Sequence, residues 1–102
     1  MKFRMERIDS EIKNALSMII SQMDDSRLAN TFVTISEVKT APDLYSSKIS
    51  IAFLKEDENS DEVLKVLNAS KGYIKKQLAN KIKIKRIPDI FFVADKTEQN
   101  AN

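Results

Sequence analysis

One stretch of the sequence concentrates side chains that can bind phosphate. Residues 68–88 contain no aspartate or glutamate, and they carry seven lysine and arginine residues. Cations that neutralise phosphates release condensed counterions, which gives affinity for nucleic acid whatever its sequence. The alternative is a solvated face whose cations favour the C-terminal end of a helix dipole. The candidate phosphate contacts are Lys71, Lys75, Lys76, Lys81, Lys83, Lys85 and Arg86.

The composition excludes most enzyme chemistry. The chain has no cysteine and no histidine, so it lacks thiol nucleophiles, imidazole bases and the usual zinc ligands. We therefore expect no catalysis, no cofactor, no metal and no small-molecule substrate. With 102 residues the chain is long enough for one domain, and its net charge of +2 does not by itself indicate a nucleic-acid binder. The distribution of the charges carries the information.

Two other groups of residues could do chemistry. Carboxylates cluster in an acidic segment, but their spacing is not that of a calcium loop, and a solvated loop is favoured. Three aromatic side chains could stack on bases, although packing at the edge of the core is favoured for each in a chain with 7% aromatic residues. The acidic residues are Glu56, Asp57, Glu58, Asp61 and Glu62, and the aromatic residues are Phe3, Tyr45 and Tyr73.

The N-terminal third predicts a helix and then a strand. Apolar residues recur every three or four positions from Met5 to Met23, which predicts an amphipathic helix over about residues 4–23. Residues 31–40 are rich in β-branched side chains and alternate at first, with Val33 and Ile35 on one face. The alternation then fails, because Val38 follows Ile35 by three positions, and this predicts a bulge near residues 36–37.

A turn and a second strand follow. The segment "APDL" favours a turn, because proline cannot extend a paired strand and proline followed by aspartate is typical of turns. Residues 47–54 alternate again, which predicts a strand with Ile49, Ile51 and Phe53 inward and with Lys48, Ser50 and Ala52 outward. The two strands are expected to form an antiparallel pair.

Residues 60–82 have one helical apolar phase, but two residues disagree with an unbroken helix. An unbroken helix would place Lys71 on the apolar stripe between Leu67 and Ile74, next to Gly72, the only glycine in the chain. A glycine in a helix costs about 1 kcal/mol relative to alanine. A break at Ser70–Gly72 would turn Lys71 into solvent and use the glycine for backbone freedom or for close helix approach. We therefore expect a helix–kink–helix.

The remaining chain completes the expected fold. Residues 88–95 begin at a proline and carry apolar side chains on both faces, which predicts a strand buried on both. The polar residues 96–102 are expected to be a disordered tail. The order is α-β-β-α-α-β, which predicts an α+β domain with a three-stranded mixed sheet and helices on one face. The chain contains no apolar run that could span a membrane and starts with the charged segment "MKFRMER", so the cytoplasm is the expected location.

Several blocks of the sequence, in order, resemble the bacterial ribosome-binding factor A family. They are "RMERIDSEIKNALSMII", "VTISEVKTAPDLYSSKISIAFL" and "LNASKGYIKKQLANKIKIKRIPDIFFVAD". The resemblance implies a type II KH-like fold in residues 1–95. It also implies that Ser70, Lys71 and Gly72 form the family's kink motif of a small residue, any residue and glycine. A single glycine cannot make the GxxG loop with which conventional KH domains clamp single-stranded RNA.

The resemblance further implies a non-enzymatic factor that binds the free 30S subunit. Such a factor contacts 16S rRNA and assists late 30S maturation and 16S rRNA processing, including in the cold, and we expect it to act as a monomer. Besides the seven cations of residues 71–86, weaker candidates for the RNA surface are Arg4, Arg7, Lys39 and Lys48. Two alternatives stay open: a general RNA-binding KH-like module, and a protein-interaction domain whose cations meet an acidic partner. About five phosphate contacts predict a slope of roughly −3.5 to −4.5 for log affinity against log salt.

Overall fold

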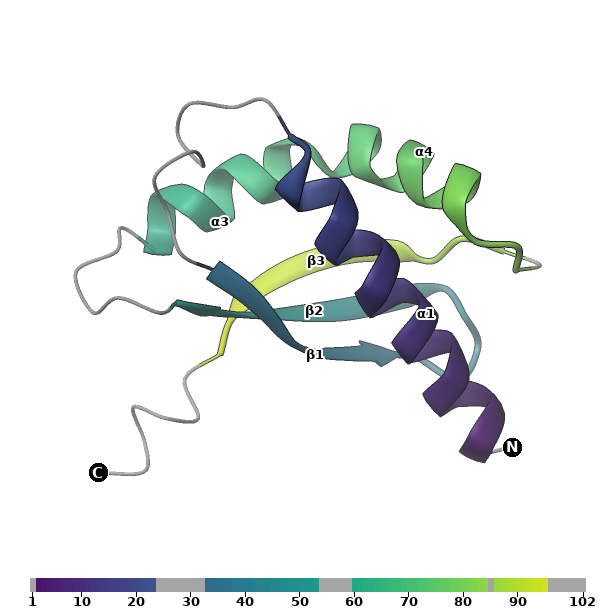
Figure 1. Ribbon diagram of the computed structural model, residues 1–102. Helices are drawn as coiled ribbons and strands as arrows, with labels where there is room; N and C mark the ends of the chain where they lie inside the picture. The colour runs from purple at the N-terminus through teal and green to yellow at the C-terminus, as the bar shows by residue number, and fades with distance from the viewer. Residues whose placement is uncertain (1, 24–32, 54–59, 85, 96–102) are drawn as a thin grey trace, which may run out of the picture.

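The computed structural model describes residues 2–23, 33–53, 60–84 and 86–95. Its elements follow the expected α-β-β-α-α-β order, with ends that differ from the predicted ones by one or two residues (Figure 1). The helices are α1 (Lys2–Ser21), α3 (Ser60–Ala69) and α4 (Lys71–Lys81), and the strands are β1 (Val33–Thr40), β2 (Ser46–Phe53) and β3 (Asp89–Ala94). The predicted tail, residues 96–102, lies outside the described residues.

The sheet is mixed, as predicted, with β2 in the centre. Strand β1 pairs with β2 in antiparallel register and β2 pairs with β3 in parallel register. The register of β1 shifts between Ile35 and Glu37, so Ser36 is the bulged residue. The three-residue spacing in the sequence therefore located the bulge correctly, because the extra residue returns Val38 to the buried face.

The three described helices cover one face of the sheet, and the core lies between the helices and the sheet (Figure 1). Helix α1 packs against β1 and α4, while α3 and α4 pack against β3. The predicted stripes meet there, since Ile12, Leu16, Leu67, Ile74 and Leu78 are all fully buried. The opposite face of the sheet carries no described helix.

Polar side chains fix the helices to the strands. The Asn68 amide of α3 binds both backbone groups of Phe92 on β3: Nδ2 donates to the carbonyl at 3.2 Å, and Oδ1 accepts the N–H at 3.0 Å. The Asp9 carboxylate of α1 accepts the Thr40 N–H at 3.0 Å. The hydroxyls of Thr40 and Ser47 share a hydrogen bond of 2.7 Å inside the core. Asn68 thereby occupies part of the free edge of β3, which would otherwise be open to another strand.

One burial prediction for the strands was wrong, and one buried position was not predicted. Phe91 of β3 is 41% exposed on the uncovered face, so β3 is not buried on both sides. Ser50 points to the outward face, as predicted, and is nevertheless buried, because β2 is the central strand and Glu37 and Val93 flank this position in register. Alternation gave the direction of each side chain, but the position of the strand within the sheet decides what covers it.

Candidate nucleic-acid interface

The break between α3 and α4 lies at Ser70 alone. Ser70 has φ −94° and ψ 5°, and its N–H still bonds to the carbonyls of Val66 and Leu67 at 3.0 and 3.1 Å. The two helices consequently lie nearly end to end (Figure 1). Lys71 is exposed, as the predicted break required.

The predicted structural role of Gly72 was wrong. Gly72 is the second residue of α4, its φ lies outside the left-handed region, and a Cβ built on it would meet nothing within 4 Å. Neither backbone freedom nor close helix approach therefore requires glycine here. The break itself is explained by Lys71, which a continued helix would have directed toward the core.

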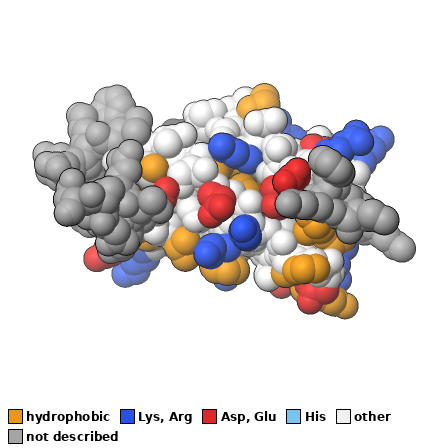
Figure 2. All heavy atoms as spheres, turned by 90° about the horizontal axis from the view of Figure 1, so that it is seen from below, with side chains coloured by type: hydrophobic (Ala, Val, Ile, Leu, Met, Phe, Trp, Pro, Cys, Tyr) orange, Lys and Arg blue, Asp and Glu red, His pale blue; other side chains and the backbone are white. Residues whose placement is uncertain are grey.

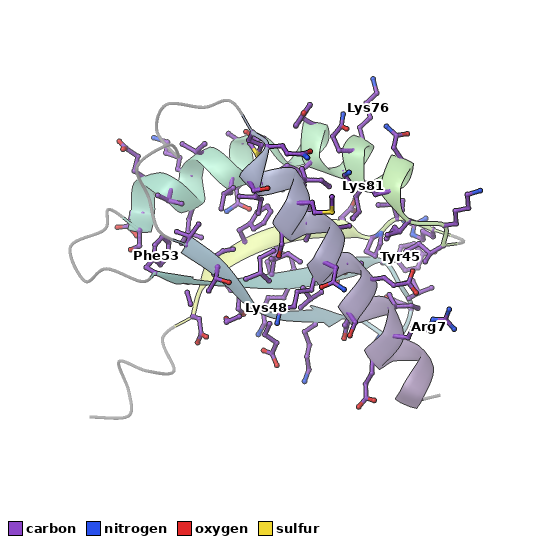
Figure 3. All side chains as sticks on the ribbon, viewed as in Figure 1. Arg7, Tyr45, Lys48, Phe53, Lys76 and Lys81 are labelled. Atoms are coloured by element: carbon purple, nitrogen blue, oxygen red, sulfur yellow. The ribbon has the colours of Figure 1, made fainter. Side chains whose placement is uncertain are left out.

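The lysines of α4 project in three directions. Helix α4 buries Ile74 and Leu78, and at 100° per residue Lys71 and Lys75 lie on one flank of that buried stripe. Lys81 lies on the other flank, in the last turn, where a cation stabilises the negative end of the helix dipole. Lys76 stands away from the sheet (Figure 3). Of these four lysines, only Lys71 and Lys75 lie on the flank of α4 that faces β3.

Asp89, the first residue of β3, places a carboxylate beside the cations on that flank. The Lys75 ammonium lies 2.6 Å from the Asp89 carboxylate. The pKa of Asp89 is lowered from its ordinary value by the hydrogen bond and charge of Lys75, and then by the charges of Arg86 and Lys71. The Asp89 carboxylate, whose side chain is 74% exposed, thus pairs with Lys75 and is stabilised further by the charges of Arg86 and Lys71. We refer to Lys71, Lys75 and Arg86 as the cation cluster.

Arg86 also stacks on an aromatic ring. Its guanidinium carbon lies 4.0 Å from the centre of the Tyr45 ring. Tyr45 is 57% exposed and Tyr73 of α4 is 55% exposed, so the prediction that these rings pack at the edge of the core was wrong. Cation–π contacts at exposed sites contribute about 0.5–1 kcal/mol.

The hairpin turn between β1 and β2 positions Tyr45. The predicted turn is present: the Leu44 N–H donates to the Ala41 carbonyl at 2.8 Å, and the Ala41 N–H donates to the Ser46 carbonyl at 2.8 Å. Asp43 Oδ1 accepts the Tyr45 N–H at 2.9 Å. Leu44 has φ 64°, an unfavourable conformation for leucine, and its side chain packs on the core. The Tyr45 carbonyl accepts the Asp89 N–H at 3.0 Å, which joins the turn to β3.

The other predicted contact residues lie elsewhere or are not described. Lys39 and Lys48 are register partners on the uncovered face of the sheet, where Figure 2 shows Lys or Arg beside Asp or Glu. Figure 3 shows Lys48 on the side of the sheet opposite Lys76. Arg7 pairs with Glu11 in α1 at 3.3 Å. Lys83 is exposed after α4, whereas Lys85 and the side chains of Arg4 and Phe3 lie outside the described residues.

Sequence reasoning missed Asp89 and gave Tyr45 the wrong surroundings. Asp89 stands directly after the carboxylate-free stretch, which was the available signal, but it reaches Lys75 across 14 positions. Of the acidic segment, Asp61 and Glu62 lie in the first turn of α3, and Glu56, Asp57 and Glu58 lie outside the described residues. Within the described ranges no three metal-ligating side chains come together, and no helix is long and apolar enough to cross a membrane.

Comparison with known proteins identifies the family. The sequence profile of ribosome-binding factor A matches residues 4–102. The chain belongs to the ribosome-binding factor A family. A member from Finegoldia magna is 34% identical over 99 residues, which cover 96% of this chain and 82% of that protein.

Solved structures share the fold of this family member. A solution NMR structure of a Thermotoga maritima protein has a TM-score of 0.79 and 30% identity, covering 89% of this chain and 86% of that one. A homology model of Thermus thermophilus ribosome-binding factor A, fitted into a cryo-EM map of its complex with the 30S subunit, has a TM-score of 0.68 and 21% identity over 86% and 91% of the two chains. The expected KH-like α+β fold is thereby confirmed.

Proposed function

We propose that the chain binds the free 30S ribosomal subunit through 16S rRNA and assists late maturation of the subunit. The observation that carries the proposal is the cation cluster on the flank of α4, in a chain whose family includes a protein fitted into a map of a 30S complex. Three cations and one carboxylate leave two positive charges in excess at this place, and phosphate is the group that such a surface attracts.

The proposed recognition is of RNA backbone and shape. Lysine and arginine contacts to phosphate position a protein on folded RNA without reading sequence, and folded rRNA offers closely spaced phosphates in a fixed arrangement. Binding stabilises the local arrangement of the subunit that presents these phosphates, which is how a factor without catalytic groups assists 16S rRNA processing and assembly in the cold. The proposed binding unit is residues 1–95, acting as a monomer in the cytoplasm.

Co-sedimentation with ribosomal particles tests the proposal. We expect the chain to migrate with 30S particles in a sucrose gradient, and not with 50S or 70S particles, in the presence of excess tRNA. If tRNA displaces the chain from 30S particles, the general RNA-binding module is the correct function. If an acidic protein competes while RNA of any kind does not, the protein-interaction domain is correct.

A charge substitution with a matched control localises the contact. Lys71→Gln removes a cation of the cluster, and Lys65→Gln removes an exposed cation from α3. We expect Lys71→Gln to weaken 30S binding and to make the salt slope less negative by about 0.7–0.9, the contribution of one phosphate contact. Lys65→Gln should leave both unchanged. Equal effects of the two substitutions would contradict a localised interface.

A further inference from the structure

Tyr45 is held as an outward-facing ring by its backbone. Both its N–H and its carbonyl are engaged, by Asp43 and by Asp89, and Leu44 before it is fixed by a packed side chain in an unfavourable conformation. These contacts fix the direction in which the side chain leaves the backbone, and the ring is 57% exposed there. An aromatic ring that is fixed and exposed loses little entropy when a flat ligand stacks on it.

Arg86 stacks on the Tyr45 ring and places a positive charge next to it. The guanidinium lies 4.0 Å from the ring centre, and Arg86 is anchored close to Pro88, which is fully buried before β3. Arg86 is also joined to the rest of the cation cluster, because Tyr45, on which it stacks, accepts the Asp89 N–H through its carbonyl, and Asp89 pairs with Lys75. Figure 3 shows Tyr45 at the end of the sheet, where the turn between β1 and β2 approaches the segment that enters β3.

We propose that the Tyr45–Arg86 pair binds one unpaired RNA base by stacking, while the phosphates next to that base contact the cation cluster. Every base has a π-face, and a tyrosine or a guanidinium plane accepts it. A base inside a duplex is covered by its neighbours, so the site selects a loop, a bulge or an end. This inference rests on the proposed function, because it takes RNA as the partner, and it adds a base contact to a backbone interface.

Abasic RNA separates stacking from charge. An unstructured oligoribonucleotide and its abasic counterpart carry the same phosphates, so only the first can stack. We expect the parent chain to bind the oligoribonucleotide at least about fivefold more tightly than the abasic strand. Tyr45→Leu should abolish this difference, whereas Tyr73→Leu, which removes the other exposed tyrosine, should keep it. Circular dichroism of both variants checks that they are folded.

Two further variants distinguish a stacking role from a structural one. Arg86→Lys keeps the charge but loses the planar group, so we expect it to reduce the preference for the base-containing strand without changing the salt slope. The chain has no tryptophan, so Tyr45→Trp introduces a single fluorophore, with Tyr73→Trp as the control. The oligoribonucleotide should quench the indole fluorescence of the Tyr45→Trp variant; the abasic strand and polyglutamate should not.

The outcomes separate this inference from the proposed function. If the parent chain binds 30S particles but Tyr45→Leu binds oligoribonucleotide and abasic strand as the parent does, the stacking site is wrong and the proposed function stands. If polyglutamate quenches as strongly as the oligoribonucleotide, the site recognises acidic chains and the stacking inference is wrong. If the folded parent chain binds neither 30S particles nor RNA at low salt, the proposed function is wrong and the inference with it.

Discussion

Replacing Gly72 by alanine tests whether the glycine serves the fold. The position lies in α4 with a φ that alanine adopts, and the added Cβ meets nothing within 4 Å. Alanine is favoured over glycine in a helix by about 1 kcal/mol, and part of the gain comes from lower entropy of the unfolded chain. Because Gly72 is only the second residue of α4, we expect Gly72→Ala to raise the free energy of unfolding by about 0.5–1 kcal/mol.

The measurement is denaturant or thermal unfolding, with the reverse substitution as control. For a domain of this size the expected gain raises Tm by roughly 2–5 °C. Ala79→Gly, at an exposed position farther along the same helix, should lower the stability by about 1 kcal/mol. A loss of stability in Gly72→Ala would refute the reasoning, since no described residue lies within 4 Å of the added methyl group. A stabilised variant with weakened 30S binding would instead show that a partner's atoms approach Cα of Gly72.

Three other predictions concern side chains that join elements. Asn68→Ala leaves two backbone groups of β3 without their partner, so we expect a loss of about 1–3 kcal/mol in urea unfolding. Thr40→Val leaves the buried Ser47 hydroxyl unpaired and should cost about 1–3 kcal/mol, while adding Ser47→Ala should recover part of that loss. Asp89→Asn frees Lys75 and should tighten RNA binding at low salt. Because the pKa of Asp89 is lowered in the folded chain, its contribution to stability is present above the ordinary aspartate pKa and disappears as the pH falls through the lowered value; acid titration of Asp89→Asn should lack this loss.

The elements could be predicted because each has a local cause in the sequence. The period of the apolar residues predicted α1 and the strands. The three-residue spacing from Ile35 to Val38, one more than alternation gives, located the bulge at Ser36. The position of Lys71 on the apolar stripe of an unbroken helix located the break. The structural role predicted for Gly72 was wrong. The burial of Ser50 and the exposure of Phe91 could not be predicted, because they depend on which strand is central and which face the helices cover.

The candidate site was less predictable because it is made by contacts between distant residues. The sequence run of cations predicted which residues form the site. Their arrangement depends on Asp89 and on the Tyr45 ring in the turn between β1 and β2, both of which lie outside that run. A sequence stretch that lacks carboxylates can still have a carboxylate beside it in the folded chain. Asp89, the residue that follows the stretch, pairs with Lys75 of α4. The local charge around Asp89 is therefore that of the cation cluster reduced by one carboxylate, not that of seven cations.

The salt dependence of binding reports this difference directly. If only Lys71, Lys75 and Arg86 meet phosphates, about three contacts give a slope of roughly −2 to −3 for log affinity against log salt. A slope of roughly −3.5 to −4.5 requires about five contacts, so cations outside the cluster, such as Lys76 and Lys81, would then also meet RNA. These two project in other directions from α4, so the steeper slope would require RNA that wraps around the helix. Because the cluster faces a single flank, we expect the shallower slope.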